Sequence, residues 1–138
     1  MNDRVVDASV VIKWVVEEPY SENALKVLNP SNRIHAPELL HIETDNYFAR
    51  QIRSRKLLIE EAEAHRRLIR SAPVRIHAYE TIADNAFDIA SLLRHGICDC
   101  IYLSLAVSID GQMVTADRRF FDLASPAFID HLLWIGDL

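Results

Sequence analysis

Four acidic residues from distant parts of the chain have the types and positions needed for shared chemistry: Asp7, Glu43, Asp99 and Asp117. Asp7 ends one short β-branched run and Asp117 closely follows another, while Asp99 begins the helical pattern that leads into the second run. In parallel α/β sheets the ligand lies beyond the carboxyl ends of the strands, so we expect the four carboxylates to converge there. Such a set of oxygen ligands suits Mg²⁺ or Mn²⁺.

Each of these acids also has a simpler explanation. Asp is a preferred N-cap, and Asp7, Asp99 and Asp117 all stand at expected helix starts. A Glu on a helix is usually a solvated surface residue. Their joint placement favours a cation site, because no lysine follows Lys56 and packed carboxylates repel one another unless protons or cations intervene.

The longest helical pattern places further polar residues beside Glu43. At about 100° per residue, Glu43, Asn46, Arg50 and Arg53 fall within one arc of roughly 80°. Asn46 could hold Glu43 or a metal-bound water, and the two arginines could reach substrate phosphates or form a solvated stripe. Asp45 lies about 200° around the helix from Glu43 and is predicted to point away.

A second basic position directly follows Asp117. Arg118 and Arg119 could cradle a phosphate or simply lie on the surface of a helix. Thr115 precedes Asp117 by two residues and would help to orient the carboxylates without binding the metal itself.

The elements that must position these residues alternate between strand and helix. Short strands are predicted at 4–7, 33–36, 74–77, 112–115 and 131–135. Helices are predicted at 8–18, 21–29, 38–56, 57–71, 79–95, 99–110 and 117–124, with a hairpin formed by the third and fourth. The segment 8–18 could also be a strand, but its length and the acid pair before Pro19 favour a helix. Gly96 and Gly111 are predicted to stop the two helices before them. This alternation predicts a parallel α/β sheet with helices on both faces.

Composition indicates one compact globular domain over residues 1–138, because 50% of the residues are hydrophobic and 25% are charged. No apolar run approaches the length of about 20 residues that a membrane span needs. The start of the chain lacks the features of a signal peptide. Cys98 and Cys100 are too few and too close for a disulfide framework, are expected to be packed, and favour a reducing cytoplasm.

Several enzyme classes lack their motifs in this chain. There is no G-x-G-x-x-G, no P-loop, no H-E-x-x-H and no G-x-S-x-G, which argues against dinucleotide binding, a P-loop nucleotidase, a zinc hydrolase and an α/β-hydrolase. The net charge of −5 counts against a simple nucleic-acid binder. That objection weakens if the acids are concentrated to hold cations.

Four segments, taken in order, resemble the PIN-domain ribonucleases, and more closely the VapC-type toxins of toxin–antitoxin pairs. They are VVDASVVIKWVVEEPYSENA, APELLHIETDN, CDCIYLSLA and VTADRRF. The resemblance runs from about residue 5 to 121. It implies a three-layer α/β/α sandwich with a central, mainly parallel sheet of four or five strands.

The resemblance also implies roles for individual residues. The family's acids fall on Asp7, Glu43, Asp99 and Asp117, which would bind Mg²⁺ or Mn²⁺ and promote hydrolysis of an RNA phosphodiester. Its accompanying polar residues fall on Ser9, Asn46 and Thr115. The implied partners are an RNA substrate, a small cognate antitoxin and a second copy of the chain. The family more often has Tyr or Ala where Cys98 and Cys100 stand.

Two other functions remain open from sequence. A receiver-like phosphoacceptor domain is also a small parallel α/β fold with an acidic Mg²⁺ site, but it would need an acid pair at the first strand and a late lysine, which is missing. A catalytically silent PIN-like module that only binds a partner is the other alternative. The complete acid set argues against it, but a sequence cannot show turnover.

Overall fold

Five parallel strands form the centre of the molecule in the computed structural model, which describes all of residues 1–138. The strands are β1 (Asn2–Val6), β2 (Asn32–Pro37), β3 (Val74–His77), β4 (Gln112–Thr115) and β5 (Leu132–Trp134), in the spatial order β3-β2-β1-β4-β5. β1 lies in the middle, with Val5 between His35 of β2 and Met113 of β4. Val5 and Val6 are fully buried, which explains why β1 is a continuous apolar run rather than an alternating one.

The order of the strands creates a crevice beside β1. From β1 the chain passes to β2 and β3 on one side, and then returns to β4 and β5 on the other. The helices that follow β1 and β4 therefore leave the sheet in different directions. Ligands of open α/β sheets bind at such a point, beyond the carboxyl ends of the strands.

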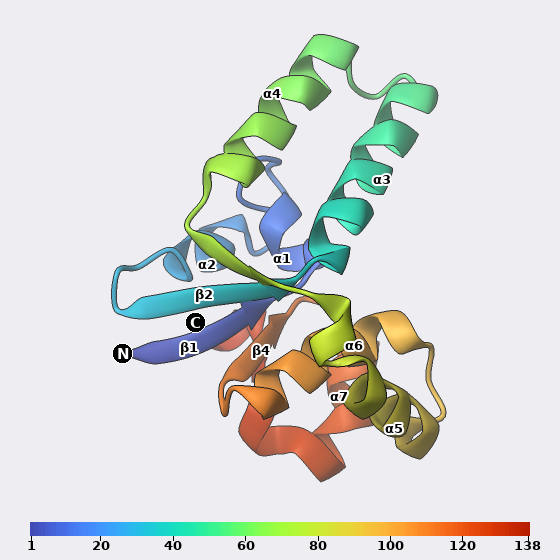
Figure 1. The fold of residues 1–138 in the computed structure, drawn as a ribbon. Helices are drawn as coiled ribbons and strands as arrows, with labels where there is room; N and C mark the ends of the chain where they lie inside the picture. Colours follow the sequence, from blue (N-terminus) through green and yellow to red (C-terminus); the bar gives the residue numbers. More distant parts are fainter.

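Helices cover both faces of the sheet. They are α1 (Ala8–Ile12), α2 (Ser21–Lys26), α3 (Leu39–Arg53), α4 (Ile59–Ser71), α5 (Ala83–Leu93), α6 (Ile97–Ser108) and α7 (Arg118–Phe128). Figure 1 shows α1 to α4 on one side of the sheet and α5 to α7 on the other. The predicted α/β/α sandwich with a parallel sheet is therefore confirmed.

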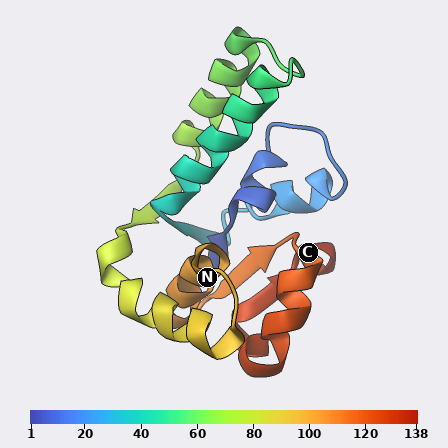
Figure 2. The same ribbon diagram turned by 90° about the vertical axis from the view of Figure 1, so that its right-hand side faces the viewer.

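The predicted helical hairpin is also present. α3 and α4 pack as an antiparallel pair that projects away from the sheet (Figures 1 and 2). Asp45 joins the two helices, since its carboxylate accepts from Arg66 Nε at 2.7 Å and from Arg70 at 3.3 Å. As predicted, Asp45 points away from Glu43.

A cluster of 27 buried side chains runs between the helices and the sheet. α6 contributes its whole middle, from Cys100 to Ala106, to this core. No single helix is both long and apolar enough to cross a bilayer, and the pair α5 and α6 meets the length and composition criteria only when taken together across a bend of 118°.

The segment 8–18 is helical only to Ile12, so the predicted longer helix is wrong beyond that point. Side-chain hydrogen bonds fold the following residues into turns: Trp14 Nε1 donates to the Ala24 carbonyl at 2.9 Å, and the Ser21 hydroxyl donates to the Val16 carbonyl at 3.1 Å. These contacts override the helical pattern. The second helix likewise ends at Lys26, before the predicted end at 29.

The predicted glycine stops are also wrong. The left-handed positions after α5 and α6 are held by Arg94 (φ 52°) and Asp110 (φ 54°), one or two residues before each glycine. Gly96 instead precedes α6 as its N-cap, so this helix begins at Ile97 and not at Asp99.

Other element boundaries differ by a few residues. The predicted helix 79–95 is a 3₁₀ turn at Tyr79–Thr81 followed by α5. α7 continues to Phe128 through Pro126, and the predicted strand 131–135 is shortened to β5. The hairpin helices end or begin within three residues of the expected positions.

Candidate active site

Asp7 lies directly after β1 and is buried, with 5% of its surface exposed. One carboxylate oxygen accepts from the Ser9 hydroxyl at 2.6 Å and from the Val10 amide at 3.1 Å, and the other accepts from the Thr115 hydroxyl at 2.7 Å. Burial raises the pKa of Asp7 to about 6, although the three hydrogen bonds oppose the shift and the nearby Asp99 carboxylate adds to it. The ionised side chain therefore lacks a compensating positive charge.

Ser9 and Thr115 connect the ends of β1 and β4. Thr115 Oγ1 donates to Asp7 and accepts from the Asp117 amide at 3.0 Å. Ser9 Oγ also donates to Asp7 and accepts from the Ala116 amide at 3.3 Å. Two hydroxyl groups thus hold Asp7 in register with the turn that carries Asp117.

Glu43 projects from α3 and is held by a tyrosine on α6. Tyr102 Oη donates to Glu43 Oε1 at 2.6 Å, and Tyr102 itself is only 1% exposed. Burial and the Asp99 carboxylate raise the pKa of Glu43, and the hydrogen bond from Tyr102 partly opposes them. Tyr102 belongs to the segment CDCIYLSLA, but its contact with Glu43 was not predicted from sequence.

Asp99 lies in the first turn of α6 and is half-exposed. Its Oδ2 is 2.8 Å from His95 Nε2, which comes from the connection between α5 and α6. His95 was not among the residues expected at the site. Its spacing of four residues before Asp99 is the signal that could have identified it.

Asp117 is the N-cap of α7 and is exposed to solvent. Its Oδ1 accepts from the Phe120 amide at 3.1 Å. Asp7 caps α1 in the same way. The capping explanation is therefore correct for both residues, and it is compatible with a second role because each retains carboxylate surface in the same cleft.

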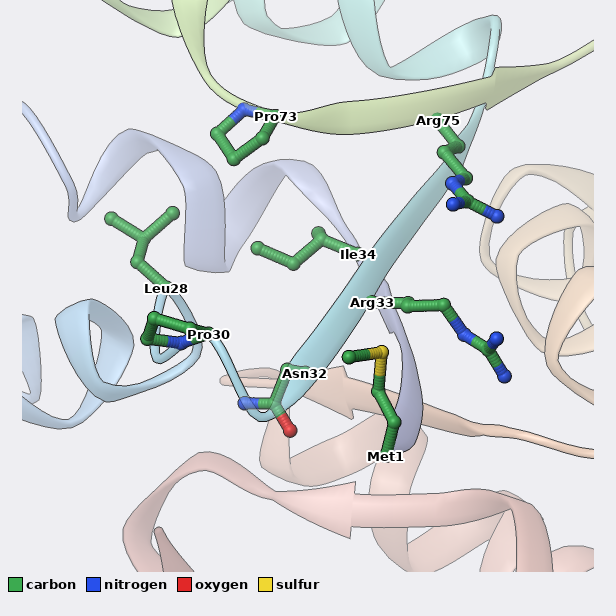
Figure 3. Close-up of a pocket in the computed structure, with 8 residues that line it drawn as sticks. All are labelled: Met1, Leu28, Pro30, Asn32, Arg33, Ile34, Pro73 and Arg75. Atoms are coloured by element: carbon green, nitrogen blue, oxygen red, sulfur yellow. The ribbon is translucent and has the colours of Figure 1, made fainter.

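The four carboxylates line one small cleft of about 160 Å³ at the carboxyl ends of β1 and β4. Its walls are Asp7, Ala8, Ser9, Glu43, Asp99, Tyr102 and Asp117. A larger groove of about 570 Å³ lies at the amino ends of the strands (Figure 3). Since that groove is lined by Arg33, Arg75, Asn32 and apolar residues and contains no carboxylate, it is a poor place for cation chemistry.

The donors in the small cleft fit a hard divalent cation. All four are carboxylates, and none of them pairs with a lysine or an arginine. No three of the side chains converge closely enough to surround one ion directly. Mg²⁺ commonly binds through one or two carboxylates and keeps several waters, so this spacing suits an ion held partly through water.

The arginines proposed from sequence occupy different surroundings. The Arg118 guanidinium lies over the rings of Phe121 and Trp134, at 5.2 and 5.1 Å, and pairs with Asp122. Arg119 makes no ion pair and lines a second cleft that contains Asp117.

Three other expected substrate or orienting residues lie outside the cleft. Arg50 and Arg53 are exposed near the end of α3, along the projecting hairpin. Asn46 is exposed and makes no side-chain hydrogen bond to Glu43, whose partner is Tyr102.

Cys98 is exposed and Cys100 is buried, so the expectation that both are packed is correct only for Cys100. Burial and neighbouring carboxylates raise the pKa of both thiols, which disfavours the thiolate form that reacts or binds metal.

A model of the PIN domain matches residues 4–126 of the chain. The chain belongs to the PIN-domain family. This PIN domain is 31% identical to the ribonuclease VapC3 of Pyrobaculum aerophilum over 121 residues, which cover 83% of this chain and 89% of that relative.

Solved structures share the fold of this PIN domain. A toxin–antitoxin complex from Klebsiella pneumoniae matches with a TM-score of 0.67 at 15% identity, covering 98% of this chain and 99% of the other. VapBC2 from Rickettsia felis, bound to a DNA fragment from its promoter, matches with a TM-score of 0.70 at 14% identity, covering 96% and 98%. At this level of identity the likeness establishes the fold.

Proposed function

We propose that this PIN domain is a divalent-metal-dependent endoribonuclease and the toxin of a toxin–antitoxin pair. The observation that supports it best is the gathering of Asp7, Glu43, Asp99 and Asp117 from four segments into one cleft, where none of them pairs with a lysine or an arginine. The ribonuclease VapC3 of Pyrobaculum aerophilum, at 31% identity, supports RNA as the substrate.

Asp7, Asp99 and Asp117 would hold a Mg²⁺ or Mn²⁺ ion, partly through its bound waters, and Glu43 would hold a second ion or the attacking water. A bound ion supplies a water of lowered pKa and neutralises charge on the phosphate during in-line displacement. Ser9 and Thr115 keep the Asp7 carboxylate in place through the hydrogen bonds at 2.6 and 2.7 Å.

Tyr102 fixes Glu43, because its phenol donates to the carboxylate from the buried side and leaves the other oxygen free for the cleft. The pKa of Tyr102 is raised by burial and by Glu43, so the phenol stays protonated as a donor. Because the pKa values of Asp7 and Glu43 are raised, a cation that binds these carboxylates must compete with protons, and its affinity should fall as the pH is lowered.

The proposed protein partner is a small antitoxin. The toxin–antitoxin complex from Klebsiella pneumoniae and the VapBC2 structure from Rickettsia felis support this, since each contains a chain that shares this fold. We also propose that the chain forms a homodimer, as the family resemblance implies.

The first test is cleavage of total cellular RNA in the presence of Mn²⁺, followed by mapping of new 5′ ends. We expect discrete ends with the wild type and their loss with Asp99→Asn. The expected reduction is at least about a hundredfold, because losing even an outer partner of a metal ligand typically costs roughly 10–100-fold in activity or affinity.

Asp88→Asn is the matched control, because Asp88 is an exposed acid on α5 outside the cleft. It should cleave like the wild type. Full activity of Asp99→Asn would contradict the assigned site. Absence of cleavage by every protein, together with no Mn²⁺ binding by calorimetry, would favour the silent interaction module instead.

A further inference from the structure

We propose that a second cleft, formed by His95, Arg119, Phe120 and Leu123 beside Asp117, binds the nucleotide next to the scissile phosphate. This inference rests on the proposed ribonuclease function and assigns a substrate subsite to it. We call this cleft the His95 cleft.

The His95 cleft adjoins the carboxylate cleft directly. Asp117 lines both of them. A second link is the 2.8 Å contact between His95 Nε2 and Asp99 Oδ2, because His95 lines the His95 cleft and Asp99 lines the carboxylate cleft. When one phosphate of an RNA strand lies among the carboxylates, the next nucleotide lies in an adjoining cleft. The His95 cleft is the adjoining cleft that shares Asp117 with the carboxylate cleft.

Its size suits part of a nucleic acid. The volume is about 370 Å³, more than twice that of the carboxylate cleft at about 160 Å³. Pockets that hold small ligands occupy roughly 300–1,000 Å³. The smaller cleft has room for a phosphate and its ion, and the larger one has room for a base or a sugar.

Arg119 gives the His95 cleft the positive charge that the carboxylate cleft lacks. Its guanidinium makes no ion pair, whereas the neighbouring Arg118 is occupied by Asp122 and two aromatic rings. An unpaired guanidinium at the rim of a cleft can bind a phosphate through two parallel hydrogen bonds. Arg119 is therefore the cationic group best placed to hold RNA near the acids.

His95 supplies a flat surface against which a base can stack. One side of its ring packs on the Phe120 ring, with centroids 5.2 Å apart and an angle of 43° between the planes. Phe120 is 1% exposed, so it supports the imidazole from the core. The His95 side chain keeps 33% of its surface exposed in the cleft. Single-stranded RNA is commonly bound through bases stacked on aromatic or histidine rings.

His95 thus has two separable tasks: its ring lines the subsite, and its Nε2 positions Asp99. His95→Phe keeps a ring but removes the hydrogen bond to Asp99. His95→Gln keeps a donor at similar reach but removes the ring. The two variants therefore distinguish substrate binding from the positioning of the carboxylate.

The experiment uses the full-length protein and a ten-nucleotide single-stranded RNA that spans a cleavage site mapped with the wild type. Steady-state kcat and KM are measured with Mn²⁺, and Mn²⁺ affinity is measured separately by calorimetry without RNA. Arg119→Ala should raise KM by roughly 10–100-fold, the effect of losing one charge-assisted hydrogen bond, and should leave Mn²⁺ affinity unchanged. Arg119→Lys should recover part of the loss, because it retains the charge.

For His95, the expected effects divide between the two measurements. His95→Gln should raise KM by about tenfold through the lost stacking and leave Mn²⁺ affinity near that of the wild type. His95→Phe should keep KM and weaken Mn²⁺ binding by about tenfold or more. The urea midpoint of each variant checks that the fold is intact.

Arg75→Ala is the charge-matched control, because Arg75 lies at the opposite ends of the strands in the groove of Figure 3. It should leave KM unchanged. An unchanged KM in both Arg119→Ala and His95→Gln, with a cleaving wild type, would overturn the subsite and leave the proposed function intact. If the wild type cleaves no RNA, the proposed function fails and the subsite fails with it.

Discussion

At the scale of single residues, the candidate site depends on hydroxyl groups as much as on carboxylates. Ser9, Thr115 and Tyr102 each donate a hydrogen bond of 2.6 or 2.7 Å to an acid of the cleft. Each hydroxyl fixes one carboxylate oxygen and leaves the remaining lone pairs for a cation or a water. Rotation of the acids is thereby restricted before any ion binds.

Tyr102→Phe tests this restriction. The change removes only the phenolic oxygen that donates to Glu43, and the ring can stay in the core. We expect kcat for RNA cleavage and Mn²⁺ affinity to fall by about tenfold, as for other residues that orient a metal-binding group. Both are measured on the mapped RNA oligonucleotide and by calorimetry.

Tyr47→Phe is the control for Tyr102→Phe, because Tyr47 is a partly buried tyrosine on α3 with no hydrogen bond to the acids. It should behave as the wild type in both assays. If Tyr102→Phe also matches the wild type, the hydrogen bond to Glu43 has no part in positioning it.

The sequence identified the acids of the cleft because their positions follow from strand ends and from a family pattern. It did not identify His95 as a partner of Asp99, and it assigned Asn46 rather than Tyr102 to Glu43. The His95–Asp99 contact spans four residues, a spacing that could have indicated it, whereas the Glu43–Tyr102 pairing depends on how α3 and α6 approach each other. Periodicity within one helix carries no information about that approach.

At the scale of elements, the succession of five strands and seven helices along the chain and the parallel sheet agree with the alternation in the sequence, whereas the spatial order of the strands was not predicted. The predicted ends of the helices agree less well. Glycines were expected to end α5 and α6, but the residues with left-handed backbone conformation there are Arg94 and Asp110. A glycine is needed at position 111 for a different reason: a Cβ there would lie 2.6 Å from the Asp3 carbonyl oxygen. The glycine allows the start of β4 to approach β1 closely.

Gly111→Ala should therefore destabilise the protein by about 1–3 kcal/mol, the usual cost of overpacking, because a backbone oxygen cannot move aside easily. Gly96→Ala is the matched control. A Cβ at Gly96 meets nothing within 4 Å and its φ is −58°, so the change should stay within about 0.5 kcal/mol. Urea denaturation measures both, and equal midpoints for the two variants would contradict the steric explanation.

At the scale of the whole molecule, a net charge of −5 and an RNA substrate appear opposed, and the placement of charge reconciles them. Part of the negative charge is concentrated in a cleft that fits a cation, and the neighbouring cleft presents Arg119. Other acids are neutralised within the fold, such as Asp3 by Arg33, and Asp45 by Arg66. The overall charge alone would have excluded the function that local placement supports.

Two carboxyl groups with opposite pKa shifts should shape the acid stability of the molecule. Arg33 and His35 lower the pKa of Asp3 to about 2, so the stability it provides is present above the unfolded value of 3.8 and is lost as the pH falls towards 2. Burial raises the pKa of Asp7 to about 6, so as the pH falls the folded protein binds a proton at Asp7 before the unfolded chain does. Asp7 therefore makes the protein more stable as the pH falls from about 6 to 4.

The free energy of unfolding, measured with urea in the presence of EDTA between pH 7 and 2.5, separates the contributions of Asp3 and Asp7 to stability. Asp7→Asn should remove the gain in stability between pH 6 and 4, and Asp3→Asn should lower stability at pH 5–7 by an amount that shrinks below pH 4. Asp88→Asn, at an exposed position on α5, should follow the wild-type curve throughout. If Asp7→Asn kept the wild-type slope between pH 6 and 4, the proton bound there would belong to another group. EDTA is needed because an ion in the cleft would hold Asp7 ionised and hide the opposing slope.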